Sequence, residues 1–238
     1  MSGSQRSFRL PERLSRASEW IPEGSRLCDV GCDHAYLPIR LCLEGKIPSA
    51  IAMDLRSGPL DAARRNVREA GLDERIALRL SDGLQNYQAG ESDTLVIAGM
   101  GGRLIARILE DAREKLSSFA DLILGPQSEA PQLRRTLQEL SCGIVQEMLV
   151  TDEGKRYLIL HAQPNRNTDL TEEEMLFGPC LLRNRDPLLQ EELLQKTTQI
   201  CALIEKLEHE TGPRAKERLG ELEKEEQHLH AALQYYAM

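Results

Sequence analysis

The sequence lacks the features that would assign it to a membrane, secreted or metal-stabilised class. Its 238 residues contain no run close to the roughly 20 apolar residues of a membrane helix, and the first ten, MSGSQRSFRL, lack the apolar stretch of a secretory signal. The six cysteines form no C-x-x-C pair, so neither a zinc site nor a disulfide framework is indicated. We therefore expect a cytoplasmic protein with no membrane segment and no metal.

An excess of basic residues is also missing. The formal net charge is −8 at pH 7, which disfavours a protein that coats nucleic acid non-specifically. Local basic patches can still bind phosphates, so the charge does not exclude an RNA substrate. What is present is a globular composition, 41% hydrophobic and 29% charged. The length suits one full hydrophobic core with a smaller attachment.

Five short apolar runs alternate with helix-like stretches in the N-terminal half. The runs are RLCDVG, AIAMDL, IALRL, DTLVIAGM and DLILG, and helices are expected over 39–43, 60–70 and 102–116. Continuously apolar strands interleaved with helices form a parallel sheet that is covered on both faces. The pattern therefore predicts a doubly wound α/β domain.

The sheet is expected to end differently from a nicotinamide-binding domain. CGIVQEMLV at 142–150 and YLILHA at 157–162 flank a turn at 152–154, which predicts an antiparallel hairpin. A parallel sheet closed by a hairpin favours a Rossmann-like class I methyltransferase fold. We place this domain at 1–165, because the polar segment AQPNRNTDLT separates it from the C-terminal part of the chain.

Residues 166–238 are expected to form a helical, coiled-coil-like hairpin. Apolar residues spaced by threes and fours predict two antiparallel helices joined by a turn at Gly212-Pro213. The predicted contact positions are Leu189, Leu193, Ile200, Leu203 and Leu207 in the first helix and Ala215, Leu219, Leu222, Leu229 and Leu233 in the second. The hairpin could position RNA or serve as a structural or dimerisation coiled coil, and we expect a monomer.

Acidic residues stand at the ends of three successive strands. The segment Asp29 to His34, DVGCDH, lies where the first strand passes to the first helix, which is where this topology binds its ligand. Gly31 would let the backbone approach a ligand closely, and N–H groups at the helix start could receive a carboxylate. The pattern is D-x-G-x-D and not G-x-G-x-x-G, which argues against a dinucleotide.

The other two acidic strand ends suit the nucleoside part of a ligand. Asp54 could accept hydrogen bonds from ribose hydroxyls, and Asp82 could accept one from the exocyclic amine of an adenine. Each residue alone has a plain structural alternative: an Asp-Gly pair is commonly only a turn, His34 could be a helix cap, and Tyr36 could be packed. The interpretation as a ligand site therefore depends on the three acids occurring together at successive strand ends, and not on any one of them.

A glycine-rich segment, Ala98-Gly99-Met100-Gly101-Gly102, follows the fourth strand. Glycines there let the backbone pass close to a flat ligand, and in this fold that strand end faces the methyl acceptor. The alternative is a flexible turn between strand and helix.

These motifs together resemble those of the bacterial TrmK family, tRNA (adenine(22)-N1)-methyltransferases. The resemblance rests on DVGCDHAYLP, AIAMDLRSGPL, SDGL and IAGMGGRLIARILE, and it extends to DEGKRY at 152–157, to FGP at 177–179 and to the helical hairpin. It implies a class I methyltransferase fold, S-adenosyl-L-methionine as donor and N1 of the adenine at tRNA position 22 as acceptor. One departure concerns 125–127, where this chain has Gly-Pro-Gln and family members carry Gln-Pro-Asn.

The resemblance also distributes roles over the site. It implies that Asp29, Gly31, Asp33 and His34 surround the methionine part of the donor, that Asp54 binds its ribose, that Asp82 and Gly83 lie near its adenine, and that Gly99, Met100 and Gly101 lie beside the target base. We add Leu55 and Ala98 as candidate donor-binding residues and Tyr36 as a candidate substrate-binding residue.

Methyl transfer to a ring nitrogen needs orientation more than a nucleophile, because the reaction is an in-line displacement. A carboxylate near N1 would stabilise the positive charge that develops on the base. We nominate Asp33 for this catalytic role, with Asp29 as the competing candidate.

A target base inside folded RNA has to be turned out, so phosphate contacts have to help. Arg13 and Arg16 lie one turn apart if Pro11 begins a helix, in a segment that also contains Arg6 and Arg9. Arg103 and Arg107 share a helix face beside the glycine-rich segment. The alternative for all of them is an ordinary solvated surface.

Two other functions remain open at this point: a methyltransferase acting on a small molecule or a protein, and a non-catalytic S-adenosylmethionine-binding protein. The basic N-terminal segment and the appended hairpin favour a large substrate over a small one.

Overall fold

The computed structural model describes residues 8–209 and 212–237. The chain forms two compact units, one containing residues 1–146 with 150–168 and the other 147–149 with 169–238. The domain boundary near residue 165 stays a prediction.

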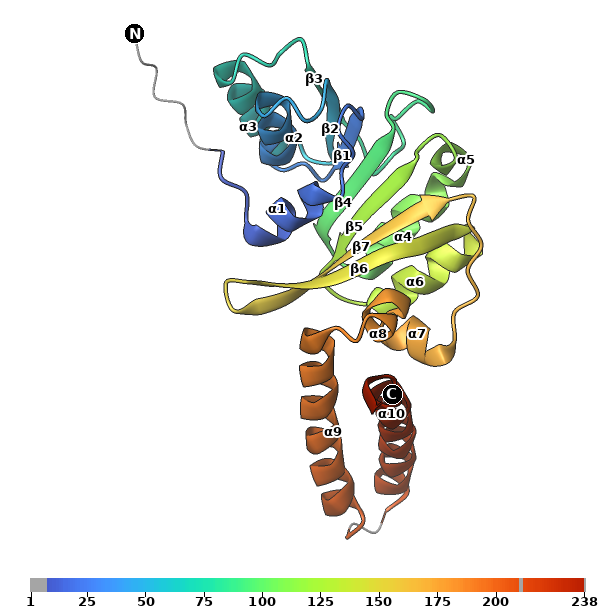
Figure 1. Cartoon of the computed structure of the whole chain (residues 1–238). Helices are drawn as coiled ribbons and strands as arrows, with labels where there is room; N and C mark the ends of the chain where they lie inside the picture. Colours follow the sequence, from blue (N-terminus) through green and yellow to red (C-terminus); the bar gives the residue numbers. More distant parts are fainter. Residues whose placement is uncertain (1–7, 210–211, 238) are drawn as a thin grey trace. The chain divides into compact units, whose positions relative to one another are not determined.

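The first unit is organised around one sheet in the order β3-β2-β1-β4-β5-β7-β6 (Figure 1). The first five strands run parallel, and β7 pairs antiparallel with β5. This order confirms the predicted Rossmann-like sheet closed by a hairpin. The strands are β1 Leu27–Val30, β2 Ala50–Asp54, β3 Ile76–Leu80, β4 Thr94–Met100, β5 Asp121–Pro126, β6 Cys142–Asp152 and β7 Lys155–Pro164.

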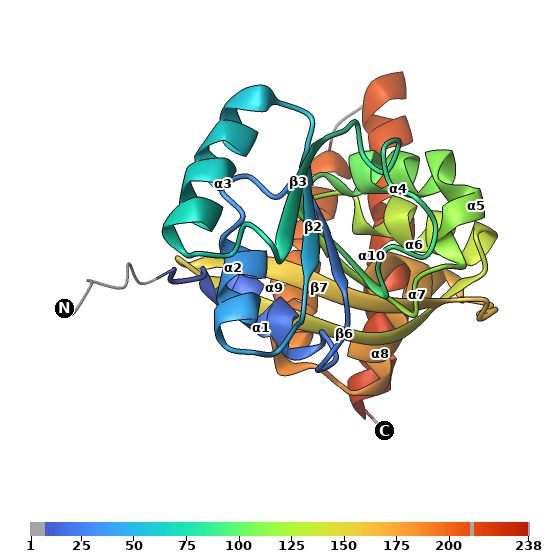
Figure 2. The ribbon, with the colours of Figure 1, turned by 90° about the horizontal axis from the view of Figure 1, so that it is seen from above.

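Helices cover both faces of the parallel part of the sheet. Figure 2 shows α2 and α3 on one side and α4, α5 and α6 on the other. The helices of this unit are α1 Glu12–Glu19, α2 Tyr36–Leu43, α3 Ser57–Glu69, α4 Gly102–Asp111, α5 Arg113–Leu116 and α6 Ala130–Glu139.

Several of these helices differ from expectation, including α3, which begins at Ser57 and not at residue 60. α2 begins at Tyr36 and not at residue 39, directly after Ala35, whose left-handed backbone (φ 59°) reverses the chain into the helix. The helix expected over 102–116 is divided, because Ala112 leaves helical geometry with ψ 17° and α5 starts anew after it. α6 was not predicted.

The core holds the strand ends in a fixed relation. Leu95 and Ile97 of β4 and Ile105 and Leu109 of α4 are fully buried in one cluster. Because β4 and α4 are both packed into this cluster, the short connection between them, the glycine-rich segment, has its position set at both ends.

The second unit is helical, as expected. It contains α7 Glu172–Phe177, α8 Pro179–Arg183, α9 Pro187–Leu207 and α10 Pro213–Ala237. Thr171 and Glu174 form a reciprocal capping box at the start of α7, and Asp186 caps α9 by accepting from the N–H groups of residues 188 and 189. The two short helices α7 and α8 were not predicted.

α9 and α10 pack against each other in this unit, which confirms the helical hairpin. Their buried residues are Leu189, Leu193, Ile200, Leu222, Leu229 and Ala232. The prediction for Leu203 is wrong: its side chain is 44% exposed, because the contact face of a straight helix drifts away from a strict repeat. None of the helices that the structure describes is long and apolar enough to cross a membrane.

Candidate cofactor and acceptor site

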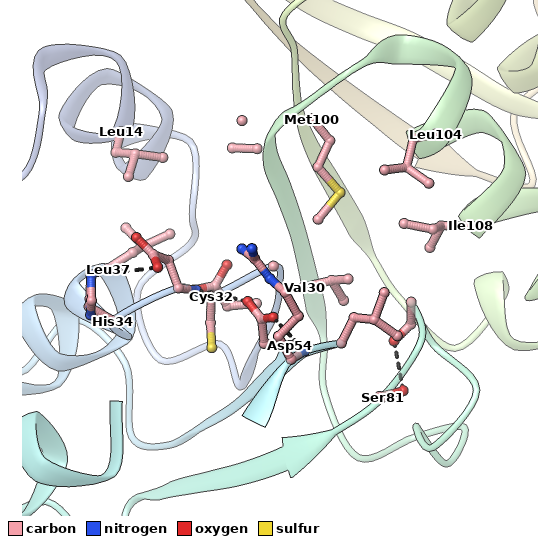
Figure 3. Close-up of a pocket in the computed structure, with 18 of the residues that line it drawn as sticks. Leu14, Val30, Cys32, His34, Leu37, Asp54, Ser81, Met100, Leu104 and Ile108 are labelled. Atoms are coloured by element: carbon pink, nitrogen blue, oxygen red, sulfur yellow. Dashed lines mark hydrogen bonds and ion pairs between the residues drawn. The ribbon is translucent and has the colours of Figure 1, made fainter. Parts of the chain in front are cut away.

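A cavity of about 540 Å³ opens at the carboxyl ends of the parallel strands (Figure 3). The loops after β1, β2, β3 and β4 line it, together with the start of α1. Most of the sequence-predicted site residues meet here: Arg13, Asp29, Gly31, Asp33, His34, Tyr36, Asp54, Leu55, Asp82, Gly83, Ala98, Gly99 and Met100. Gly101, Arg16 and Arg103 are not among the lining residues.

The loop after β1 is shaped by left-handed backbone. Gly31 has φ 77°, and Asp33 has φ 49°, a conformation that is uncommon outside glycine. The N–H groups of Gly31 and Cys32 both donate to the carbonyl of Met53, at 2.8 and 3.0 Å, which pins the loop to β2. Asn66 of α3 donates to the carbonyl of His34 at 2.9 Å. The loop is therefore held from both neighbouring elements.

Asp54 joins two of these loops. Its buried carboxylate accepts from the N–H of Arg56 at 2.9 Å and from the N–H of Asp33 at 3.3 Å. A carboxylate has about four acceptor positions, so two bonds leave capacity for a ligand hydroxyl. The geometry suits the ribose-binding role expected of Asp54.

Asp29 is the most perturbed acid of the cavity. It is only 6% exposed, and burial raises the pKa of its carboxyl to about 7, with a further contribution from the charge of Asp54. Its carboxylate makes no hydrogen bond to any residue that the structure describes. A buried carboxylate in this state favours a cationic ligand group such as an ammonium.

Asp33 and His34 are much more open to solvent. The Asp33 side chain is 67% exposed, and its Oδ1 lies 3.6 Å from Nε2 of His34. The His34 and Tyr36 rings lie side by side, with centroids 5.4 Å apart. Cys32, which precedes Asp33 in the same loop, is buried. Burial raises the pKa of its thiol, so it stays a neutral thiol instead of a nucleophile.

Asp82 and Gly83 close the cavity on the β3 side. Nη2 of Arg107 lies 3.4 Å from Oδ1 of Asp82, and Ser81 donates to the carbonyl of Gly83 at 2.9 Å. A Cβ on Gly83 would lie 2.9 Å from Cγ2 of Ile108. Gly83 is therefore required for packing against α4, whatever ligand it faces.

The glycine-rich segment serves two purposes. Gly99 has φ 81° and no atom closer than 3.9 Å to the position of a Cβ, so it leaves open space in the cavity. Gly102 is different: a Cβ there would lie 2.5 Å from the carbonyl oxygen of Ser128, and one on Gly101 would lie 3.2 Å from Oγ of the same residue. The last two glycines allow α4 to pack on the loop after β5.

Met100 reaches across the cavity. Its side chain points from the end of β4 toward β1 (Figure 3), and a side chain on Gly31 would collide with its terminal methyl group. The two residues therefore face each other, and the width of the cavity between β1 and β4 depends on the absence of a side chain at position 31.

Several lining residues were not anticipated. Apolar side chains from α2, β1 and α4 form much of the wall: Val30, Leu37, Leu104 and Ile108. They lie within the segments that resemble the family, but none was singled out as a site residue; Val30, Leu37 and Ile108 are buried, and Leu104 is 40% exposed. Gln127, after β5, also lines the cavity. The departure from the family pattern at 125–127 was the available signal for it.

The arginines proposed for RNA contact form ion pairs within the protein. α1 begins after Pro11, as expected, and the guanidinium carbon of Arg13 also lies 5.0 Å from the ring centre of Tyr157. Exposed ion pairs are weak, which applies to the pairs of Arg16, Arg103 and Arg107. The pair of Arg13 is different, because its partner Asp152 is buried. The pairs are Arg13 with Asp152 at 2.7 Å, Arg16 with Glu19 at 2.8 Å, Arg103 with Glu129 at 2.9 Å and Arg107 with Asp82 at 3.4 Å.

Of the two further arginines of the N-terminal segment, one lies among the described residues and does not line this cavity. Arg9 lines a separate polar hollow beside α1 and α2. Arg6 lies outside the described residues. No group of three or more His, Cys, Asp or Glu residues within the described ranges is arranged to hold a metal ion.

Known proteins with the same architecture bind the expected cofactor and its product. Sp1610 of Streptococcus pneumoniae in complex with S-adenosyl-L-methionine is 36% identical, with a TM-score of 0.82, covering 94% of this chain and 100% of that one. TrmK of M. capricolum with S-adenosyl-homocysteine is 25% identical, with a TM-score of 0.82, covering 95% and 98%.

The sequence matches agree with the structural ones. The tRNA (adenine(22)-N(1))-methyltransferase of Bacillus subtilis (strain 168) is 34% identical over 205 residues, which are 84% of this chain and 86% of the relative. The family model described as TrmK, tRNA (adenine(22)-N(1))-methyltransferase, matches residues 27–230. With the sheet, the cavity and these matches in agreement, the chain belongs to the TrmK family of tRNA (adenine(22)-N(1))-methyltransferases.

Proposed function

We propose that this protein transfers a methyl group from S-adenosylmethionine to N1 of the adenine at position 22 of bacterial tRNA, and that it works in the cytoplasm as a monomer. The observation that carries the proposal is the cavity, where three strand-end acids and the glycine-rich segment of a TrmK family member meet. The alternatives, a small-molecule or protein methyltransferase and a non-catalytic binding protein, have no comparable support.

The lining residues fit S-adenosylmethionine. The volume lies in the range of about 300–1,000 Å³ that is typical of ligand pockets. Asp29 would take the ammonium group of the donor, because its buried carboxylate lacks a partner among the described residues. Asp54 retains acceptor capacity for the ribose hydroxyls, and Asp82 stands at the side expected for the adenine. Gly31 leaves the backbone open to close approach.

When bound, S-adenosylmethionine supplies a methyl group on a positively charged sulfur. The protein has to hold the target base in line with that methyl group and keep water away, and the apolar wall made by Leu37, Leu104 and Ile108 suits that task. N1 of a neutral adenine already carries a lone pair, so no base is needed before the attack. The exposed carboxylate of Asp33 would stabilise the positive charge that builds up on the ring.

The test of the function is transfer of labelled methyl to an unmodified tRNA transcript, followed by nucleoside analysis. We expect 1-methyladenosine in tRNA with adenine at position 22 and none when that base is replaced. Donor binding without transfer to tRNA would refute the proposal and leave the small-molecule, protein or non-catalytic alternatives.

The catalytic nomination has its own test. Asp33→Asn should lower kcat about 100-fold, the loss typical of one electrostatic contact in the transition state, while donor and tRNA affinities stay near those of the wild type. A variant with full turnover would exclude Asp33 and return the role to Asp29.

A further inference from the structure

Gln127 lies at the boundary between two hollows of the first unit. It lines the 540 Å³ cavity, and it also lines a small neighbouring hollow between α1 and β7, together with Arg13, Gly99 and Tyr157. Its backbone N–H donates to the carbonyl of Met100 at 2.8 Å. This bond anchors residue 127 beside the end of β4, on the side of the cavity away from β2 and β3.

The side-chain amide of Gln127 is available for a ligand. The residue is exposed, and its amide makes no hydrogen bond to the residues that the structure describes. Nε2 lies 3.9 Å from the position that a Cβ on Gly99 would occupy. Because Gly99 has no side chain, the space beside the amide stays open to a flat ring.

We propose that Gln127 binds the target adenine through the N6 and N7 atoms of its Hoogsteen edge. The inference rests on the proposed function and assigns the base-reading contact within it. A glutamine amide can accept from N6–H and donate to N7 at once, which is the bidentate pairing that glutamine makes with adenine. This contact leaves N1 free to face the donor.

The same contact explains the choice of base and assists the reaction. Guanine has an acceptor at position 6, so it would set a carbonyl oxygen against the amide oxygen of Gln127. Methylation at N1 places positive charge on the ring and on N6, so the bond from N6–H to the Gln127 oxygen strengthens as the reaction proceeds. Gln127 therefore contributes to kcat as well as to binding of the base.

The experiment combines a protein variant with an altered base. Wild type, Gln127→Ala and the control Gln132→Ala, an exposed glutamine in the first turn of α6, are assayed on tRNA with adenine or 7-deazaadenine at position 22. The 7-deaza base lacks the N7 acceptor but keeps N1 and N6. Donor affinity and unfolding are measured for each variant, because a variant with intact fold and donor binding isolates the acceptor side.

We expect Gln127→Ala to lower kcat/KM on adenine tRNA about 10- to 100-fold and Gln132→Ala to leave it unchanged. The 7-deaza base should cost the wild type about fivefold, the effect of one hydrogen bond, and should cost Gln127→Ala nothing. Equal sensitivity of both proteins to the 7-deaza base would overturn the assignment, as would a wild type insensitive to it. A wild type inactive on adenine tRNA would instead refute the proposed function itself.

Discussion

Asp29 offers the sharpest physical test of the site, because its ionisation is opposed by the fold. Burial raises the pKa of its carboxyl from 3.8 to about 7. One pKa unit corresponds to about 1.4 kcal/mol, so ionised Asp29 destabilises the ligand-free native state by about 4 kcal/mol.

The sign of the pH effect is set by the order of proton release. The unfolded chain releases the Asp29 proton near its ordinary pKa, whereas the native protein holds it until about pH 7. Stability therefore falls as the pH rises between these values and levels off above them. Between pH 5 and pH 8 this group alone lowers the free energy of unfolding by about 3 kcal/mol.

Asp29→Asn removes the titrating carboxyl, so the variant should not show the loss of about 3 kcal/mol in unfolding free energy between pH 5 and pH 8. Urea unfolding at pH 5, 6, 7 and 8, followed by the fluorescence of Trp20, measures it within the first unit, because this is the single tryptophan of the chain. Asp73→Asn, at an exposed position, should keep the wild-type slope. If Asp29→Asn and the wild type lose the same stability between pH 5 and pH 8, the account of a buried, unpartnered carboxylate is wrong.

Two further predictions concern the cavity wall and the RNA contacts. Gly31→Ala should lower the free energy of unfolding by about 1–2 kcal/mol because of its positive φ. It should also weaken S-adenosylhomocysteine binding at least tenfold by calorimetry, since the new Cβ meets Met100. The control Gly71→Ala, with φ 67° and no atom within 4 Å, should lose similar stability and keep the affinity. Arg103→Gln should reduce the slope of log affinity for tRNA against log salt concentration by about 0.7–0.9. Glu129→Gln removes the ion-pair partner of Arg103 and should tighten tRNA binding. An unchanged slope in Arg103→Gln would exclude a phosphate contact.

The fold was accessible from the sequence because the signals are local. Continuously apolar runs such as AIAMDL fix buried parallel strands, and the turn at 152–154 fixes a hairpin whatever surrounds it. The donor-side acids were accessible for the same reason. Asp29 and Asp54 lie in the last two residues of β1 and β2, and Asp82 follows β3 by two residues. The carboxyl ends of parallel strands meet at one edge of the sheet, so these acids come together there.

The structure alone decided what depends on contacts between distant segments. Gly101 reads like a ligand-facing glycine, yet it lies against the loop after β5, and Arg13 reads like a free cation, yet it is paired with Asp152, 139 residues away. The raised pKa of Asp29 and the position of Gln127 beside the cavity also depend on contacts between distant segments. Sequence spacing determines which residues reach the edge of the sheet, whereas side-chain burial, pairing and open space arise only when elements far apart in the chain pack together.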